Sequence, residues 1–292
     1  MSASALRFQI GARTLGEIPR RLVRVALSLD QALAGEVPAL PPLDGQEDGF
    51  LVTSLPESVS LRWPGISFVR QRYVRYHVDL AAGVDAWRAG LTGQARATLK
   101  RKARKLATAN GGLLDVRRYR TPVELAAFHP LARAVSATTY QERLMGAGLP
   151  ADPAHGGEAA ARDEVRAWLL FLHERPIAYL WCRADGDTLR YEHVGHDPAH
   201  NALSPGSVLL GEALDDLFGD RFHRFDFTEG EGQHKRSLAS GGIACRDLLL
   251  LRPTLANRAA VMAVGGFDAA MRIAARVARA PALAGLARRI RR

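Results

Sequence analysis

The spacing of hydrophobic residues changes along residues 189–218. Residues 189–194 alternate with a period of two, which predicts a strand with Tyr191 and His193 on one face and Glu192 on the other. After the polar turn 195–203 the period lengthens, which predicts one apolar helix face formed by Leu210, Leu214, Leu217 and Phe218. This order of strand, turn and helix is the segment around which we expect the rest of the chain to be arranged.

The expected helix begins in the sequence Ser204-Pro205-Gly206-Ser207. Ser204 suits the N-cap, and Pro205 suits the first helical position, where an N–H group would have no partner. Gly206 leaves the first turn without a side chain. Free N–H groups and the positive end of the helix dipole then form a site for an anion such as a pyrophosphate, although many helices also begin in this way without a ligand.

A short apolar strand is expected next, at residues 224–228, and it leads into an acidic, glycine-containing loop that ends in His234 and Lys235. This order resembles the acyl-CoA half of the GNAT acyltransferases and, more closely, the CelD/BcsL-like GNAT family, relatives of the FemABX peptidyltransferases. Four patches carry the resemblance: Arg72-Tyr73 through Asp79-Leu80, the basic helix 95–106, the turn Ser204-Pro205-Gly206, and Asp226-Phe227-Thr228 followed by Gly230 and Lys235. The acetyltransferase signature Gln/Arg-x-x-Gly-x-Gly/Ala does not occur in the turn before the expected helix.

The resemblance implies an α/β fold with a GNAT-like mixed, mostly antiparallel sheet flanked by helices. It also implies transfer of an acyl group from acyl-CoA, used as a substrate, to an amine. The expected acceptor is an amine-bearing envelope component, either a lipid such as a sphingoid base, in a ceramide-synthase-like reaction, or an amino sugar. Two alternatives stay open: a FemABX-like ligase that uses aminoacyl-tRNA, and a non-catalytic GNAT scaffold at a membrane.

Acyl transfer to an amine needs a base, hydrogen-bond donors for the carbonyl oxygen and a proton for the leaving thiolate. The strand at 189–194 offers His193 or Glu192 as the base and Tyr191 as the acid. Asp226 is a further catalytic candidate beside the next strand, unless it only caps a turn. Free N–H groups of a strand can polarise the thioester carbonyl without a special side chain.

Other polar residues are candidates for binding the two substrates. We expect Lys235 to hold the CoA phosphates, or else to pair with a carboxylate, together with the turn Ser204-Pro205-Gly206-Ser207. Tyr140 and Gln141 precede a long loop rich in Gly, Pro and Ala, and such loops often serve binding sites. With Glu229, they are expected to contact the acceptor. No His-Glu-x-x-His or Cys-x-x-Cys spacing occurs, so no metal is expected.

A basic helix is expected at residues 94–109. Its cations form two rows at helical spacing, Arg96-Lys100-Arg104 and Arg101-Lys105. Like charges at this density destabilise an isolated helix. Either solvent offsets them, or a bound polyanion does so, such as CoA phosphates, lipid headgroups or tRNA.

The remaining pattern predicts strands at 50–54, 66–80, 113–118, 177–183 and 243–251, and a core strand or short helix at 165–174. Helices are expected at 18–33 and 121–134. The expected domains are a partial N-terminal lobe at 1–80, a GNAT-like acyltransferase domain at 81–255 and a basic amphipathic helical tail at 256–292.

Composition narrows the class of protein. A hydrophobic fraction of 47% with 24% charged residues is typical of a globular chain. The net charge of +10 favours acidic partners. No apolar run suits a signal peptide or a transmembrane helix. Two cysteines give no disulfide framework, so we expect a cytoplasmic protein, peripheral on the inner face of the membrane if its tail binds lipid.

The tail from residue 257 differs from the rest of the chain because it is rich in alanine and arginine. Arg272, Arg276 and Arg279 fall on one side of an expected helix, and Ile273 and Val277 fall on another. A basic amphipathic helix is typical of an element that binds an anionic membrane surface. The alternative is a helix that packs on its own domain with a solvated basic face.

Overall fold

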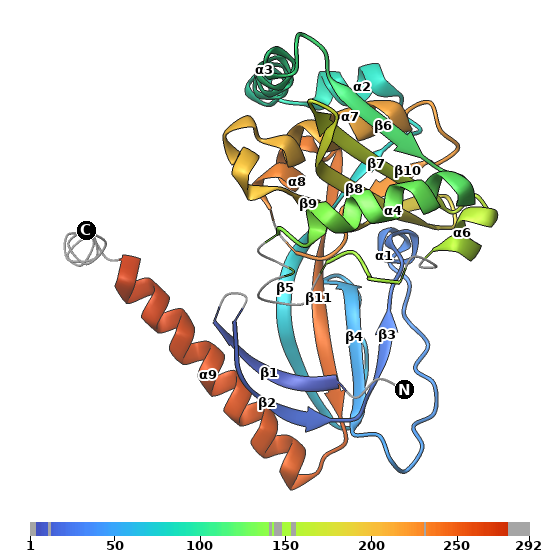
Figure 1. Cartoon of the computed structure of the whole chain (residues 1–292). Coiled ribbons are helices and arrows are strands. Elements are labelled where there is room, and N and C mark those ends of the chain that lie inside the picture. The colour runs from blue at the N-terminus through green and yellow to red at the C-terminus, as the bar shows by residue number, and fades with distance from the viewer. Residues whose placement is uncertain are drawn as a thin grey trace. The chain divides into compact units, whose positions relative to one another are not determined.

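The structure is a computed structural model that describes residues 4–10, 13–139, 142, 148–152, 156–230 and 232–279 (Figure 1). Contacts divide the chain into two compact units. The first combines Met1–Leu27, Gly35–Arg72 and Arg246–Arg292, and the second combines Ser28–Ala34 with Tyr73–Cys245. The domain boundaries expected at residues 80 and 255 cut the chain into consecutive segments, and they stay a prediction. Each compact unit, in contrast, is assembled from segments that are separate in the sequence.

The second unit contains a mixed sheet with the strand order β5-β10-β9-β8-β7-β6. β10 runs parallel to β9 and antiparallel to β5, and each neighbouring pair from β9 to β6 is antiparallel. The expectation of a mixed, mostly antiparallel sheet is therefore confirmed. The strands are β5 (Ile66–Asp79), β6 (Asp115–Tyr119), β7 (Val165–Leu172), β8 (Arg175–Asp185), β9 (Thr188–His196) and β10 (Arg224–Asp226).

The helices of this unit are α1 (Leu29–Ala34), α2 (Val84–Gly90), α3 (Gly93–Ala109), α4 (Pro122–Ser136), α6 (Gly157–Ala161), α7 (Pro205–Leu217) and α8 (Gln233–Leu238), with the 3-10 turn η1 (Pro198–Leu203). Local sequence explains where two of them begin. Thr121 and Glu124 form a reciprocal capping box at the start of α4, and the Thr92 side chain caps α3. The sequence did not predict α8, because its six residues carry no apolar periodicity.

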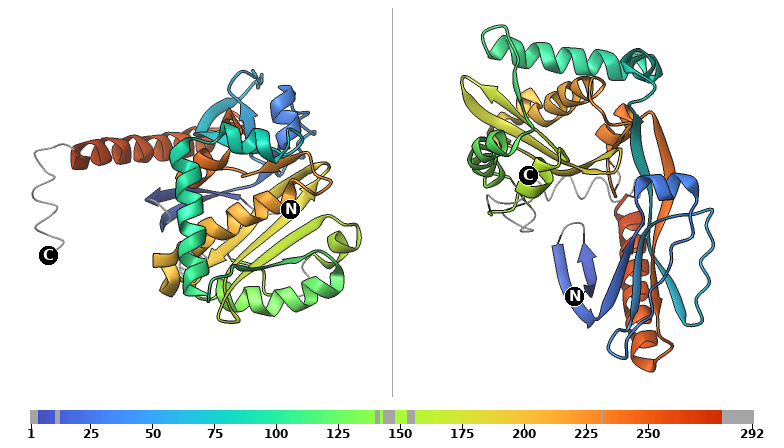
Figure 2. Two further views of the ribbon diagram at one scale, coloured as in Figure 1. Left: turned by 90° about the horizontal axis from the view of Figure 1, so that it is seen from above. Right: turned by 90° about the vertical axis from the view of Figure 1, so that its right-hand side faces the viewer.

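Two hydrophobic cores lie on opposite faces of this sheet. α7 and α3 cover one face, and α4 covers the other (Figure 2). Side chains of β7 alternate between the cores: Trp168 and Leu170 face α7, and Ala167 and Leu169 face α4. This strand is buried on both faces, which explains its continuous apolar run.

β7 also buries a charge. The Arg166 side chain has no exposed surface and donates to Asp220, with a 2.6 Å contact from Nε to Oδ2. Nη1 of Arg166 lies 2.8 Å from Oδ1 of Asp163. The buried cation is thus matched by two carboxylates, as a buried ion needs to be.

The first unit combines a hairpin with further strands. The strands β1 (Ser4–Ile10) and β2 (Arg13–Arg20) pair antiparallel, and β3 (Leu22–Ala26) runs parallel to β4 (Gly49–Pro56). β11 (Gly241–Leu251) lies between β4 and β5, and both β5 and β11 contribute residues to each unit. The helix α9 (Leu255–Arg279) packs near β1, with Phe267 against Phe8 at 5.3 Å between ring centroids.

The helix expected at 18–33 is wrong. Residues 18–20 end β2 and residues 22–26 form β3; only residues 29–34 are helical. Two features favour the strands. Pro19 cannot donate a hydrogen bond inside a helix, and Val23 and Val25 are β-branched residues that pair with β4.

Candidate functional site

β9 carries a bulge at the centre of the candidate site. Trp181 of β8 pairs with His193 and Cys182 pairs with Tyr191, so Glu192 is the additional residue. The bulge changes the expected alternation. Tyr191 packs toward the core under α7, whereas His193 lies opposite Trp181, a residue of the core under α4. Tyr191 and His193 therefore lie on different faces of the sheet, contrary to the sequence prediction.

β9 and β10 separate shortly after they pair. β10 pairs with β9 only along Thr188–Arg190, whereas β9 continues to His196. Within the part of the chain that the structure describes, no strand pairs with the β10 side of β9 beyond Arg190. Thr228 closes part of this edge through a 3.4 Å contact from its Oγ1 to the Tyr191 carbonyl. The opening leaves backbone groups of β9 that can bind a ligand.

A cavity of about 390 Å³ lies between this part of β9 and the start of α7. It contains Tyr191, Ser204, Gly206 and Ser207, four of the residues that the sequence selected. Its other lining residues are Val194, Gly195, His196, Asn201, Leu210 and His234. Nε2 of His196 donates to Oδ1 of Asn201 over 2.7 Å, so this imidazole is oriented by its neighbour.

The start of α7 differs in one respect from the prediction. Pro205 is its first residue, as expected, but Ser204 adopts the left-handed conformation with φ 54° and its side chain makes no capping bond. The N–H groups of Ser207 and Val208 donate to the Ser204 carbonyl at 3.1 and 3.2 Å. A Cβ at Gly206 would lie 3.3 Å from Nδ1 of His196, so a side chain there would crowd this imidazole. The start of α7 therefore has no side-chain cap, and its first turn packs closely against His196.

Two lysines of the basic helix α3 lie beside this helix start. Nζ of Lys102 is 3.0 Å from Oγ of Ser207, and Nζ of Lys105 is 2.8 Å from the Ala202 carbonyl. A second cavity of about 470 Å³ adjoins the first, since both contain Ser207 and His234. The helix dipole and two cations therefore act at the same place, which suits a phosphate group.

Tyr191 and His234 are the titratable side chains of the first cavity whose environment changes their acidity most clearly. Burial raises the pKa of the Tyr191 hydroxyl far above its usual range, so the phenol stays protonated. Burial, together with repulsion from Lys235 and Lys102, lowers the pKa of His234. His234 is thus neutral at physiological pH and able to accept a proton.

Asp226 and Lys235 hold the backbone next to the opening. Asp226 is fully buried, and its two carboxylate oxygens accept from Nε and Nη2 of Arg75 at 3.1 and 2.6 Å. Nζ of Lys235 donates to the carbonyls of Phe227 and Glu229 at 2.8 and 2.9 Å, and burial lowers its pKa. These contacts account for both side chains structurally. Their predicted catalytic and CoA-binding roles stay predictions.

The structure does not bring every predicted residue into the cavity. His193 and Glu192 do not line it, and Glu192 lies 3.9 Å from Nη1 of Arg190. Glu229 is half-buried in the loop before α8. Tyr140 and Gln141 lie outside the described residues. His196 and Asn201 were missed because the sequence offered only a polar turn there, with no signal for the direction of its side chains.

The mixed sheet, the parallel strands that separate, and the helix start beside the opening together define a GNAT-type acyltransferase fold. Residues 93–236 match the family described as acetyltransferase (GNAT) domain. This part of the chain is therefore a GNAT-type acetyltransferase domain.

Solved structures are also similar to this chain. One is the C-terminal domain of a putative lysylphosphatidylglycerol synthetase from Agrobacterium fabrum, with 11% identity, a TM-score of 0.51, and coverage of 76% of this chain and 72% of that chain. L-PGS from Bacillus licheniformis has 10% identity, a TM-score of 0.46 and coverage of 74% and 71%. FemX has 10% identity, a TM-score of 0.41 and coverage of 61% of each chain. At these identities the likeness concerns the fold alone. No curated protein matches the chain.

The described residues also bear on metal binding and on membranes. No group of three or more His, Cys, Asp or Glu side chains gathers there in a way that could hold a metal ion. None of the helices described is long and apolar enough to cross a membrane.

Proposed function

We propose that the protein is an acyl-CoA-dependent N-acyltransferase that acylates an amine of an envelope component, with a lipid amine as the preferred acceptor and an amino sugar as the other. The observation that carries the proposal is the bare start of α7, with Lys102 at Ser207, directly beside the opening between β9 and β10. Phosphates of the donor are held by the N–H group of Gly206 and by Lys102. Acyl-CoA is a substrate in this scheme.

The chemistry follows from the groups around the cavity. Backbone N–H groups of the open β9 edge donate to the thioester oxygen as negative charge develops on it. The amine attacks the carbonyl carbon, the carbon–sulfur bond breaks, and the Tyr191 hydroxyl gives its proton to the leaving thiolate. The proton of the amine goes to a base. His234 suits this role because it lines the cavity and is neutral; His193 and Glu192, which the sequence favours, are the other candidates.

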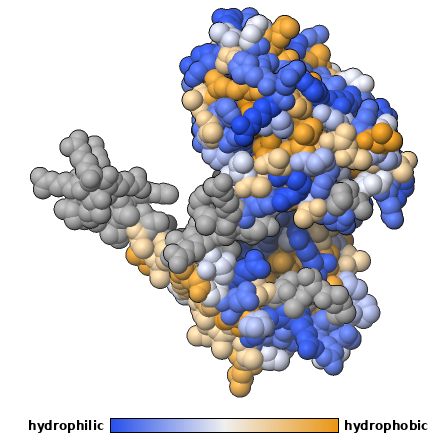
Figure 3. All heavy atoms as spheres, in the orientation of Figure 1, coloured by the Kyte–Doolittle hydropathy of each residue, from blue (hydrophilic) through white to orange (hydrophobic). Residues whose placement is uncertain are grey.

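A lipid acceptor is supported by the outer face of α9. Leu255 is 83% exposed, Met262 75% and Ile273 61%. Their spacings of seven and eleven residues place them within roughly 20° of one another around a helix. In Figure 3 the surface that α9 occupies is mostly cream and orange. We propose that this face binds an anionic membrane surface, so that the protein is peripheral on the inner face of the cytoplasmic membrane.

The experiment that tests the donor is thermal unfolding with acetyl-CoA and with palmitoyl-CoA. A ligand at a hundred times its Kd adds about 2.7 kcal/mol to the free energy of unfolding. Gly206→Glu should remove this stabilisation, because its side chain meets His196 and its charge repels phosphate. Gly157→Glu is the matched control, since no atom lies within 4 Å of a Cβ at Gly157. Equal stabilisation of both variants would place the donor elsewhere.

A second candidate function is transfer from aminoacyl-tRNA, because α3 presents exposed cations such as Arg101 and Arg104. A direct comparison of acyl-CoA and aminoacyl-tRNA as donors separates the two reactions. Transfer from the tRNA alone would overturn the proposal in favour of the ligase. Binding without transfer from either donor would favour the non-catalytic scaffold.

A further inference from the structure

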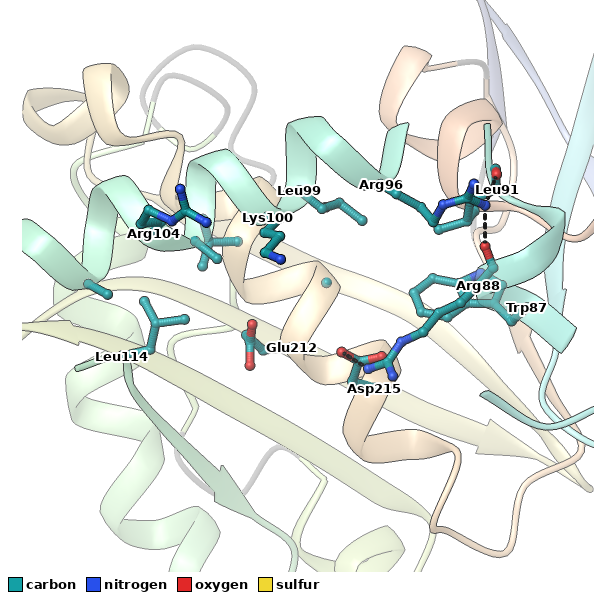
Figure 4. A pocket seen from close by; sticks show the side chains of 14 residues that line it. Trp87, Arg88, Leu91, Arg96, Leu99, Lys100, Arg104, Leu114, Glu212 and Asp215 are labelled. Atoms are coloured by element: carbon teal, nitrogen blue, oxygen red, sulfur yellow. Dashed lines mark hydrogen bonds and ion pairs between the residues drawn. The ribbon is translucent and has the colours of Figure 1, made fainter. Parts of the chain in front are cut away.

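A third cavity, larger than the other two, lies on the far flank of α3. Its volume is about 640 Å³, and its walls come from α2, α3, α7 and Leu114 (Figure 4). No residue that lines it belongs to the 390 Å³ cavity beside β9. The volume is in the range of small-molecule sites. We refer to this cavity as the α3–α7 groove.

The floor of the α3–α7 groove is apolar. It is formed by Trp87, Leu91, Leu99, Ala103, Ala107, Leu114, Val208 and Gly211. A Cβ at Gly211 would already touch Cδ2 of Leu99, at 3.4 Å. A longer side chain at this position would extend into the groove. The floor therefore suits an apolar chain.

The rim of the groove carries the whole row Arg96-Lys100-Arg104 that the sequence singled out. Arg96 is already used, since its Nη1 donates to the carbonyls of Arg88 and Leu91 at 2.8 and 2.6 Å. Arg88 pairs with Asp215 at 2.9 Å. Among the described residues, Lys100 and Arg104 have no acidic partner within 4 Å. Two exposed cations thus stand beside an apolar floor.

Two acids line the groove: Asp215, which pairs with Arg88, and Glu212. The Glu212 carboxyl lies on the α7 wall below Lys100 and Arg104 (Figure 4). Burial raises the pKa of this carboxyl, and the nearby Asp215 raises it further. Glu212 therefore loses its charge more readily than an exposed glutamate, and the groove becomes more positive as the pH falls.

We propose that the α3–α7 groove binds a single-chain anionic amphiphile of the fatty-acid type, with its chain on the apolar floor and its acidic head at Lys100 and Arg104. Such a ligand satisfies both observations at once: it covers apolar surface, and it offsets a row of like charges that destabilises the helix. A polynucleotide would match the cations but would leave the apolar floor uncovered. The site is separate from the acyl-transfer cavity and does not rest on the proposed function.

Titration calorimetry of the full chain with decanoate tests the proposal. Decanoate should bind, 1-decanol should bind at least about fivefold more weakly for want of the charge, and butyrate should bind more than roughly a hundredfold more weakly for want of six CH₂ groups. Saturating CoA should leave decanoate binding unchanged. Equal binding of decanol and decanoate, or displacement of decanoate by CoA, would overturn the assignment.

Variants locate the site. Lys100→Gln and Arg104→Gln should each weaken decanoate binding roughly fivefold, and Gly211→Leu should abolish it by filling the groove. Glu212→Gln should strengthen it, an effect that mere loss of structure does not produce. Arg101→Gln is the matched control, because Arg101 is an exposed cation of the same helix that does not line the groove. If Arg101→Gln weakens binding as much as Lys100→Gln, the ligand is held by general charge and the proposal fails.

Discussion

The surroundings of His234 determine the protonation state of its side chain. In the sequence it is one polar residue of a loop, but in the structure it borders two adjoining cavities, next to Lys102 and Lys235. Burial and these cations favour the neutral imidazole. The sequence could identify chemically able residues, but it could not show which of them face the cavity. Tyr191 and His193 lie on different faces of the sheet because of the bulge at Glu192, which no pattern in the sequence predicted.

The identity of the base leads to a prediction for catalysis. We expect His234→Asn to lower kcat by roughly two to four orders of magnitude, the usual contribution of a general base. Because the pKa of His234 is lowered, the acid limb of the wild-type pH–rate profile should have its midpoint below about 6.5. The same assay on His193→Asn and Glu192→Gln tests the residues that the sequence favoured. A loss confined to one of these two would move the role to that residue.

The charged cluster around Arg166 leads to a prediction for stability. Hydrogen bonds from Arg120 and Arg166 hold the pKa of Asp163 far below its usual range. Burial opposes the charge of Asp220, but hydrogen bonds from Arg166 and the Arg221 N–H outweigh it and lower its pKa as well. Both carboxylates thus contribute stability above their unfolded pKa, near 4, and this contribution is lost as the pH falls below that value.

Urea unfolding between pH 3 and pH 7 measures this loss. The midpoint for the wild type should fall steeply below about pH 4. Asp220→Asn should be less stable at neutral pH, since Arg166 keeps only Asp163, and its midpoint should depend less on pH. Asp185→Asn, which changes an exposed aspartate at the end of β8, is the control. An unchanged pH slope in Asp220→Asn would contradict this account of the cluster.

Elements were predicted best where their apolar spacing decides burial. The expected face of α7 is one case, because Leu210, Leu214 and Leu217 are all buried. The strands predicted at 177–183 and 189–194 are another. The prediction failed at 18–33, where apolar residues fit a helix and strands equally and long-range pairing with β4 decides the outcome. Local sequence does not contain that partner.

The outer face of α9 leads to a prediction for membrane binding. Met262→Glu should reduce binding to vesicles that contain anionic lipid, because a charge would enter the headgroup boundary. Wild-type binding should rise with anionic lipid content and weaken with salt, since each arginine near the surface contributes about 1 kcal/mol. Arg272, Arg276 and Arg279 lie within α9, but their side chains are outside the described part of the chain.

Val123→Glu is the matched control for this experiment. Val123 is 81% exposed, like Met262, but lies on α4. Equal loss in both variants would mean that added charge alone weakens binding. A concentration-dependent dimer of the wild type without vesicles, abolished by Met262→Glu, would instead assign this face of α9 to a second copy of the chain.

At the scale of the whole molecule, the net charge of +10 bears on how the donor arrives. A field of this sign attracts the phosphates of CoA over a distance that salt shortens to about 8 Å at physiological ionic strength. We therefore expect the association rate of acyl-CoA, followed by stopped-flow fluorescence, to fall as salt is added. An uncharged pantetheine thioester should associate at a rate nearly independent of salt. Equal salt dependence of the two would exclude steering by charge.

Because the ribosome makes the chain from its N-terminus, the two units are completed at different times during synthesis. The second unit is complete once Cys245 has been synthesised, whereas the first still awaits Arg246–Arg292. Because domains generally fold as units during synthesis, the acyltransferase unit should resist protease in ribosome-bound chains that are arrested well beyond β11, before α9 has left the exit tunnel. Until β11 has been synthesised, the N-terminal strands β1–β4 lack the strand that lies beside β4 in the finished protein. A cell making this protein would therefore need to shield the earliest part of the chain for the longest time.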